Sequence, residues 1–167
     1  MLAGKLLIRA GLTSGYNVTY IPSYGAEVRG GTAHCHVIIS PEEIASPIIE
    51  RPDACLVMNG PSLQKFIPRI RPAGRMIVNS SLAGEEGKRK DIRTIRIPAG
   101  EIAEAAGNIK AANMAMLGSY LAGSSLLTLE TVRKTLIDFL PARHRDLLEI
   151  NLKALRNGYD YSRTNGE

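Results

Sequence analysis

Apolar positions near the start of the chain recur at the spacing of a helix. Leu2, Leu6, Leu7 and Ala10 would fall on one side of such a helix, with Lys5 on the other. A Thr-Ser-Gly triplet follows, and small polar residues of this kind end helices. The pattern therefore predicts an amphipathic helix at the start of the chain.

Beyond this helix the pattern changes to short β-branched and apolar runs. The strands that these runs predict cover residues 18–21, 33–39, 54–58, 76–78 and 92–97. Alternation within 33–39 places Cys35 and Ile39 on one face and the two histidines on the other. The run 54–58 is apolar at every position, which is typical of a strand covered on both faces. The run 92–97 alternates Ile with Arg and Thr, so we expect it nearer an edge.

The remaining segments have helical patterns. Pro61 lies in the first turn of one helix, where its missing N–H is tolerated, and two later prolines end that helix. Further helices are predicted over residues 101–106, 109–121, 130–140 and 145–156. Strands interleaved with helices predict an α/β fold, a three-layer α/β/α sheet domain over residues 1–158 with a helical C-terminal third. The polar residues 159–167 are expected to form a frayed tail.

Composition excludes several classes of protein. The 167 residues are 44% hydrophobic and 22% charged, as in an ordinary globular domain. A net charge of +5 raises the question of nucleic-acid binding. However, the basic residues are dispersed along the chain, only 5% of residues are aromatic and Trp is absent, so bases would find few stacking platforms. We therefore favour a basic face that meets an acidic partner protein.

The two cysteines and the chain's hydropathy indicate where the protein works. Cys35 and Cys55 form neither a Cys-x-x-Cys pair nor a disulfide framework. The opening residues are too short and too soon charged for a signal peptide. No apolar run approaches the ~20 residues of a membrane-spanning helix. These features predict a cytoplasmic protein without a membrane segment.

A polar, glycine-rich segment between the first two expected strands is the strongest candidate for a binding site. It places Glu27 and Arg29 two residues apart, with glycines on either side that let the backbone pass close to a ligand or partner. An arginine so placed can form two parallel hydrogen bonds to a carboxylate or phosphate. The alternative is a long hairpin connection whose two charged side chains face water. The residue types leave both interpretations open.

His34 and His36 raise the question of a metal site. They project from one strand face at a spacing at which two imidazoles can bind Zn²⁺. A third ligand is missing, because Cys35 points to the opposite face and His144 lies far along the sequence. A structural role at the sheet surface is therefore favoured. The sequence also contains no Ser-His-Asp arrangement, P-loop or EF-hand.

The segment from Pro22 to Val37 resembles the gamma subunit of 2-oxoacid:ferredoxin oxidoreductases, a unit that is also the third domain of the single-chain pyruvate enzymes. The run Ser-Tyr-Gly-Ala-Glu-Val-Arg-Gly-Gly-Thr within it is long and specific. The resemblance continues through Asn113–Gly118 and Asn151–Gly158 and covers nearly the whole chain. The Thr-Ala-His-Cys-His run is most similar to subunits of the 2-oxoglutarate and branched-chain 2-oxoacid enzymes.

This resemblance implies an accessory subunit without chemistry of its own. The complex oxidatively decarboxylates a 2-oxoacid, here expected to be 2-oxoglutarate, with coenzyme A, giving an acyl-CoA, CO₂ and reduced ferredoxin. Its thiamine diphosphate, Mg²⁺ and iron–sulfur clusters lie on the alpha, beta and delta subunits, which are the expected partners, with ferredoxin an indirect one. No catalytic residue, metal or cofactor is expected on this chain. The residues expected to contact the partner subunits or coenzyme A are Tyr24, Gly25, Glu27, Arg29, Gly30 and Gly31.

The sequence departs from the family at its start. Members begin with a strand and a Gly-x-Gly-Gly-Gln-Gly turn before the helix that here starts at Leu2, and this sequence shows neither. Met1 resembles an internal methionine of the family, so we expect a start assigned too late or a truncated chain. An absent strand would leave an open slot in the sheet. The isolated chain would then form a homodimer through strand pairing, or its first helix would be displaced.

A free-standing nucleotide-binding α/β domain is the alternative function, although it would need the glycine-rich turn.

Overall fold

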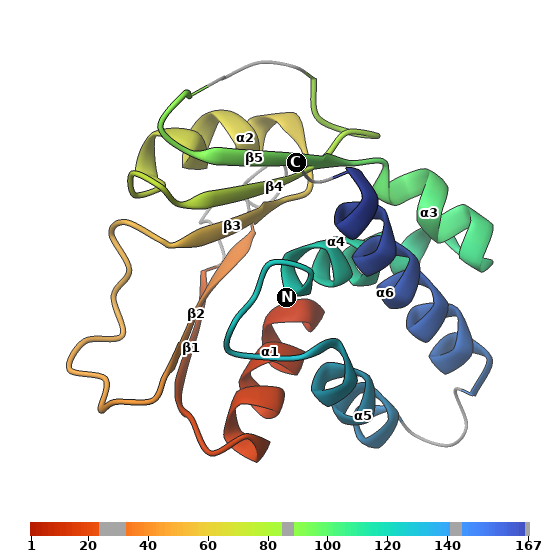
Figure 1. The fold of residues 1–167 in the computed structure, drawn as a ribbon, viewed down its shortest axis with the longest axis horizontal. Coiled ribbons are helices and arrows are strands. Elements are labelled where there is room, and N and C mark those ends of the chain that lie inside the picture. The colour runs from red at the N-terminus through yellow and green to blue at the C-terminus, as the bar shows by residue number, and fades with distance from the viewer. Residues whose placement is uncertain (24–32, 85–88, 141–144, 166–167) are drawn as a thin grey trace.

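Among the described residues, strands are interspersed with helices up to residue 97, and helices with their connections make up the part that follows (Figure 1). The computed structural model describes residues 1–23, 33–84, 89–140 and 145–165. The strands are β1 (Asn17–Ser23), β2 (His34–Ser40), β3 (Ala54–Val57), β4 (Arg75–Asn79) and β5 (Arg93–Ile97). The helices are α1 (Leu2–Thr13), α2 (Gly60–Phe66), α3 (Ala99–Ala106), α4 (Ala112–Leu121), α5 (Leu129–Phe139) and α6 (Arg145–Asn165), with the 3₁₀ turns η1 (Ile67–Arg69) and η2 (Ile109–Ala111).

A parallel sheet of β3, β4 and β5, in that order, forms the middle layer. Side chains of β4 alternate between two cores because successive residues of a strand point to opposite faces. Met76 packs in the core that includes Leu63 of α2, whereas Ile77 packs in the core formed with α1, α3, α4 and α6. The three-layer α/β/α prediction is thus confirmed, and β5 lies at an edge as its sequence predicts.

The first two strands form a sheet of their own. β1 and β2 pair antiparallel from Asn17 opposite Ser40 to Ser23 opposite His34. Among the described residues, this hairpin does not join the parallel sheet, so the strands fall into two sheets. One edge of β3 has no described strand beside it, and the open slot expected from the sequence stays a prediction.

Helix α1 packs against the hairpin and against α5. Leu6 and Ala10 are fully buried, and Leu7 is nearly so. The expected displacement of the first helix is therefore not observed, because the hairpin and α5 cover its apolar side. On β2, Cys35 lies against α1 near Gly4, on the face that alternation predicts.

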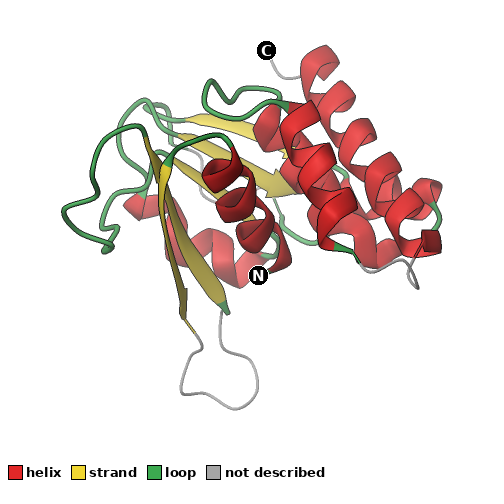
Figure 2. Cartoon of the chain, turned by 90° about the horizontal axis from the view of Figure 1, so that it is seen from below, coloured by secondary structure: helices red, strands yellow, loops and turns green. Residues whose placement is uncertain are grey.

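The C-terminal helix is longer than its sequence pattern predicts. The prediction ended it at Arg156 with a frayed tail after Gly158, but α6 continues to Asn165. Ser162 is buried, and its hydroxyl donates a hydrogen bond of 2.6 Å to Ser119 Oγ on α4. The prediction of a frayed tail is wrong because this segment has α4 to pack on. Figure 2 shows most of the helices gathered on one side of the strands.

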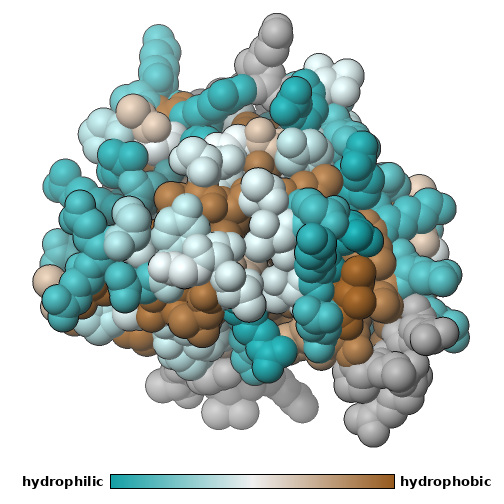
Figure 3. All heavy atoms as spheres, turned by 60° about the horizontal axis from the view of Figure 1, so that its bottom comes forward, coloured by the Kyte–Doolittle hydropathy of each residue, from teal (hydrophilic) through white to brown (hydrophobic). Residues whose placement is uncertain are grey.

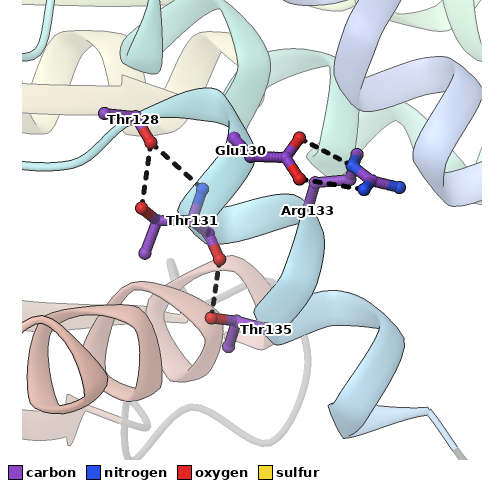
Figure 4. A network of polar contacts seen from close by, with 5 residues as sticks. All are labelled: Thr128, Glu130, Thr131, Arg133 and Thr135. Atoms are coloured by element: carbon purple, nitrogen blue, oxygen red, sulfur yellow. Dashed lines mark hydrogen bonds and ion pairs between the residues drawn. The ribbon is translucent and has the colours of Figure 1, made fainter.

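Two helix starts show how side chains set the ends of elements. Asn59 Oδ1 accepts a hydrogen bond from Ser62 N at the start of α2, and Thr128 Oγ1 accepts one from Thr131 N at the start of α5. Both satisfy N–H groups that the first helical turn leaves unpaired. Figure 4 shows the second cap, with the Glu130–Arg133 ion pair on the same turn.

None of the described helices is both long enough and apolar enough to span a bilayer.

Candidate functional site

The loop that the sequence favours as a binding site lies outside the described residues. All six of its candidates, Tyr24, Gly25, Glu27, Arg29, Gly30 and Gly31, fall in the range 24–32. The structure does define where this segment is attached, because Ser23 and His34 are paired at the end of the β1–β2 hairpin. The role of the six residues stays a prediction.

The two histidines of β2 lie together on the face away from α1. Their ring centroids are 5.4 Å apart, and the His34 ring packs edge-on against Phe66 at 5.0 Å. Burial, together with the neighbouring His34 and Arg69, lowers the pKa of His36. His36 is consequently neutral at pH 7. Within the described part of the chain, no three His, Cys, Asp or Glu side chains are grouped to hold a metal ion.

The two cysteines are free thiols in the structure. Burial raises the pKa of Cys55 to about 12, so this thiol is protonated at neutral pH. A protonated thiol is a poor nucleophile. The interpretation of Cys55 as a packing residue agrees with this environment.

A second candidate site is a cavity at the carboxyl ends of the parallel strands. Ligands of open α/β sheets commonly bind at this edge. The cavity has a volume of about 360 Å³ and lies between the ends of β3 and β4, the start of α3, and η2 with the start of α4. Its lining comprises Met58, Asn79, Ser81, Leu82, Gly100, Glu101, Glu104, Ile109, Lys110, Ala112 and Asn113.

A short hydrogen-bond network forms one wall of the cavity. The Asn79 side chain is fully buried, donates to Met58 O (3.4 Å) and accepts from Ser81 N (3.2 Å). Ser81 Oγ in turn accepts from Gly100 N and donates to Glu101 Oε2 at 2.5 Å. The bond from Ser81 lowers the pKa of Glu101, which holds its carboxylate ionised. The network ties β4 to the first turn of α3.

The opposite wall carries an unsatisfied acceptor and apolar side chains. Asn113 Oδ1 is buried and has no hydrogen-bond partner among the described residues. Leu82 and Ile109 are 67% and 56% exposed at the rim. The cavity can therefore receive a donor group with an apolar body.

The cavity is not apparent from the sequence, because its lining comes from four segments that are separate along the chain. The one signal available was the polar run Asn-Ser-Ser directly after a buried strand. At the carboxyl end of a parallel strand, such a run is placed to face a ligand site.

The comparisons with known proteins agree with the fold. The sequence profile described as pyruvate ferredoxin/flavodoxin oxidoreductase matches residues 1–161. The ketoisovalerate oxidoreductase subunit VorA of Methanothermobacter marburgensis is 38% identical over 165 residues. That alignment covers 98% of this chain and 34% of VorA, so the chain spans about a third of this relative's length. The 2-oxoglutarate synthase subunit KorC of Methanocaldococcus jannaschii is 28% identical, with 98% of this chain and 87% of KorC covered.

Among solved structures, the gamma subunit of a keto/oxoacid ferredoxin oxidoreductase from Geobacter sulfurreducens superimposes with a TM-score of 0.80. It is 25% identical, and the match covers 95% of this chain and 88% of that subunit. The profile match extends over almost the entire length, and the fold agrees with it. The chain belongs to the pyruvate ferredoxin/flavodoxin oxidoreductase family.

Proposed function

We propose that the chain is the gamma-type accessory subunit of a 2-oxoacid:ferredoxin oxidoreductase. The observation that carries this proposal is the correspondence with the Geobacter gamma subunit, a separate polypeptide of which the chain covers 88%. In this role the chain binds the alpha and beta subunits, and a delta subunit where there is one. Reduced ferredoxin is a product of the complex and not of this chain.

The residues of the chain do not fit the complex's redox cofactors. An iron–sulfur cluster is commonly held by four cysteines, and the sequence contains two. These two, Cys35 and Cys55, lie on different sheets. We therefore assign the clusters, together with thiamine diphosphate and Mg²⁺, to the other subunits.

Two 2-oxoacid substrates are supported to different degrees. The Thr-Ala-His-Cys-His run favours 2-oxoglutarate or a branched-chain 2-oxoacid, with 2-oxoglutarate expected. The relatives favour the branched-chain 2-oxoacid, because the chain is 38% identical to the ketoisovalerate oxidoreductase subunit and 28% identical to the 2-oxoglutarate synthase subunit. An assay of the complex should therefore offer both substrates.

The surface is compatible with a subunit that has partners. Figure 3 shows apolar residues, in brown, reaching one face in patches between hydrophilic residues. Elsewhere Ile48 is 70% exposed. Apolar patches of this kind mark sites of protein association. Without partners, the apolar edge of β3 is expected to pair with a second copy, which gives a homodimer.

The loop 24–31 is proposed to contact the partner subunits or coenzyme A. Its support is the Glu27–Arg29 pair flanked by glycines and the attachment of the loop to the end of a hairpin. A guanidinium can bind the phosphates of coenzyme A or a partner carboxylate in the same way.

Purification of the tagged chain from its own host, followed by mass spectrometry of what elutes with it on gel filtration, tests the proposal. We expect stoichiometric co-elution of thiamine-enzyme and ferredoxin-like subunits. Elution of the chain free of any such subunit at native expression levels would contradict it.

A further inference from the structure

Arg75, the first residue of β4, carries a charge that no described acidic side chain balances. Its Nη1 atom is buried and has no hydrogen-bond partner among the described residues, while the side chain as a whole is half-buried. Keeping a cationic donor unpaired in a partly dry environment is unfavourable. The free chain therefore leaves this donor without a hydrogen bond among the described residues, which points to a role in binding.

The guanidinium of Arg75 is held in one place. Its Cζ atom lies 5.4 Å from the centre of the Tyr120 ring, at the end of α4. In the turn after α4, a Cβ atom on Gly123 would lie 2.1 Å from Nη1. Because Gly123 has no side chain, the guanidinium of Arg75 has room to lie against it. A group fixed before binding loses less conformational entropy when a ligand arrives.

The surroundings of Arg75 call for a negative charge. Arg93 is its register partner on β5, and side chains at paired positions of a parallel sheet project from the same face. Like charges directly opposite on neighbouring strands are unfavourable. The acidic residue before β3, Asp53, is paired with Arg71 at 2.6 Å. It does not serve as the counter-charge of Arg75.

We propose that Arg75 is the docking point for an aspartate or glutamate side chain of a partner polypeptide. A carboxylate can accept two hydrogen bonds from a guanidinium. Arginine and tyrosine are the side chains enriched at energetically important interface positions, which favours a polypeptide over a free phosphate. Arg75 as a whole is only half-buried and Gly123 beside it is exposed, so a protruding side chain can reach the accessible part of the guanidinium at this edge of the sheet. The inference rests on the proposed function, in which the chain works bound to other subunits.

The test compares R75M with wild type, and R133Q serves as the matched control. Met keeps the side-chain stem over Tyr120 and removes the charge. R133Q removes the same charge from the exposed surface of α5, where Arg133 pairs with Glu130. Each variant is measured for association with the complex's purified alpha and beta subunits between 50 and 300 mM NaCl, about the range over which ionic screening changes strongly. The melting temperature of each chain alone is measured in parallel.

We expect R75M to bind at least about 10-fold more weakly, with a smaller salt dependence, because a buried interfacial charge pair is lost. Its melting temperature should equal or exceed that of wild type, and R133Q should bind within about twofold of wild type. Equal binding of R75M and wild type would overturn this inference alone. So would a fall in the melting temperature of R75M, which would assign Arg75 to the chain's own stability. Failure of wild type itself to bind the partner subunits would overturn the proposed function and this inference with it.

Discussion

Gly118 of α4 and Gly158 of α6 form a reciprocal contact at the centre of the helical third. A Cβ atom on Gly118 would lie 2.0 Å from the carbonyl oxygen of Leu155, and one on Gly158 would lie 2.0 Å from the carbonyl oxygen of Ala115. Each glycine therefore admits the backbone of the other helix, and both helices must separate if either glycine gains a side chain.

Replacement of either glycine by alanine should destabilise the chain. Overpacking of a tight contact by one methyl group typically costs about 1–3 kcal/mol, and backbone atoms cannot move aside as a flexible side chain can. Urea unfolding of G118A and G158A measures this loss. G60A is the control, because nothing lies within 4 Å of a Cβ atom at Gly60. If G118A or G158A proved as stable as G60A, the close helix crossing would be wrong.

The buried Ser119–Ser162 hydrogen bond predicts that the last turns of α6 belong to the folded core. S162A removes the donor and should lower the free energy of unfolding by about 1 kcal/mol. The double variant S119A/S162A should lose less than the sum of the single variants, because no hydroxyl is then left unpaired. T164A, at an exposed position on the same helix, should change stability by less than about 0.5 kcal/mol. Strict additivity of the two serine variants would contradict the contact.

The raised pKa of Cys55 predicts a thiol that reacts more slowly in the folded chain than after unfolding. Burial disfavours the thiolate, and a folded pKa of about 12 lies 3 units above the ordinary 9.0. In a C35A background, alkylation at pH 8 should therefore be about 1,000-fold slower in the folded chain than in urea. Equal rates in the two states would contradict the burial of this thiol.

The same pKa shift sets a pH dependence of stability. The pKa of the Cys55 thiol is higher in the folded than in the unfolded chain. The thiol's contribution to the free energy of unfolding is therefore fully present below pH 9 and is lost as pH rises from 9 toward 12. Substitution of Cys55 by Val in the C35A background should remove this decline.

Arg29 is predicted to matter for assembly or coenzyme A handling more than for folding. Substitutions in polar surface loops usually change stability by less than about 0.5 kcal/mol. R29A should leave the melting temperature nearly unchanged while it lowers the activity of the assembled complex or raises its KM for coenzyme A. A large fall in melting temperature with full activity would instead show a buried structural pair.

Local pattern was enough to predict most elements of this fold. Apolar spacing over Leu2–Ala10 identified α1, which buries the face that its periodicity defines. The all-apolar run at Ala54 identified β3, although of its residues only Val57 is fully buried. The end of α6 was missed although Leu155, Tyr159 and Ser162 recur at helical spacing, because the intervening charged residues dominate the composition there. The Gly118–Gly158 contact and the cavity beside Asn113 depend on which segments meet in space. A single sequence does not contain that information.

We propose that the chain has no chemistry of its own and acts by completing a complex. This proposal is tested most directly by assaying oxidative decarboxylation with coenzyme A and a viologen acceptor, using 2-oxoglutarate and ketoisovalerate as alternative substrates. Three preparations are compared: the chain alone, the partner subunits alone, and all of them together. We predict no turnover by the isolated chain and full turnover only by the assembled complex. Turnover by the isolated chain, or undiminished turnover by the partner subunits without it, would contradict the account.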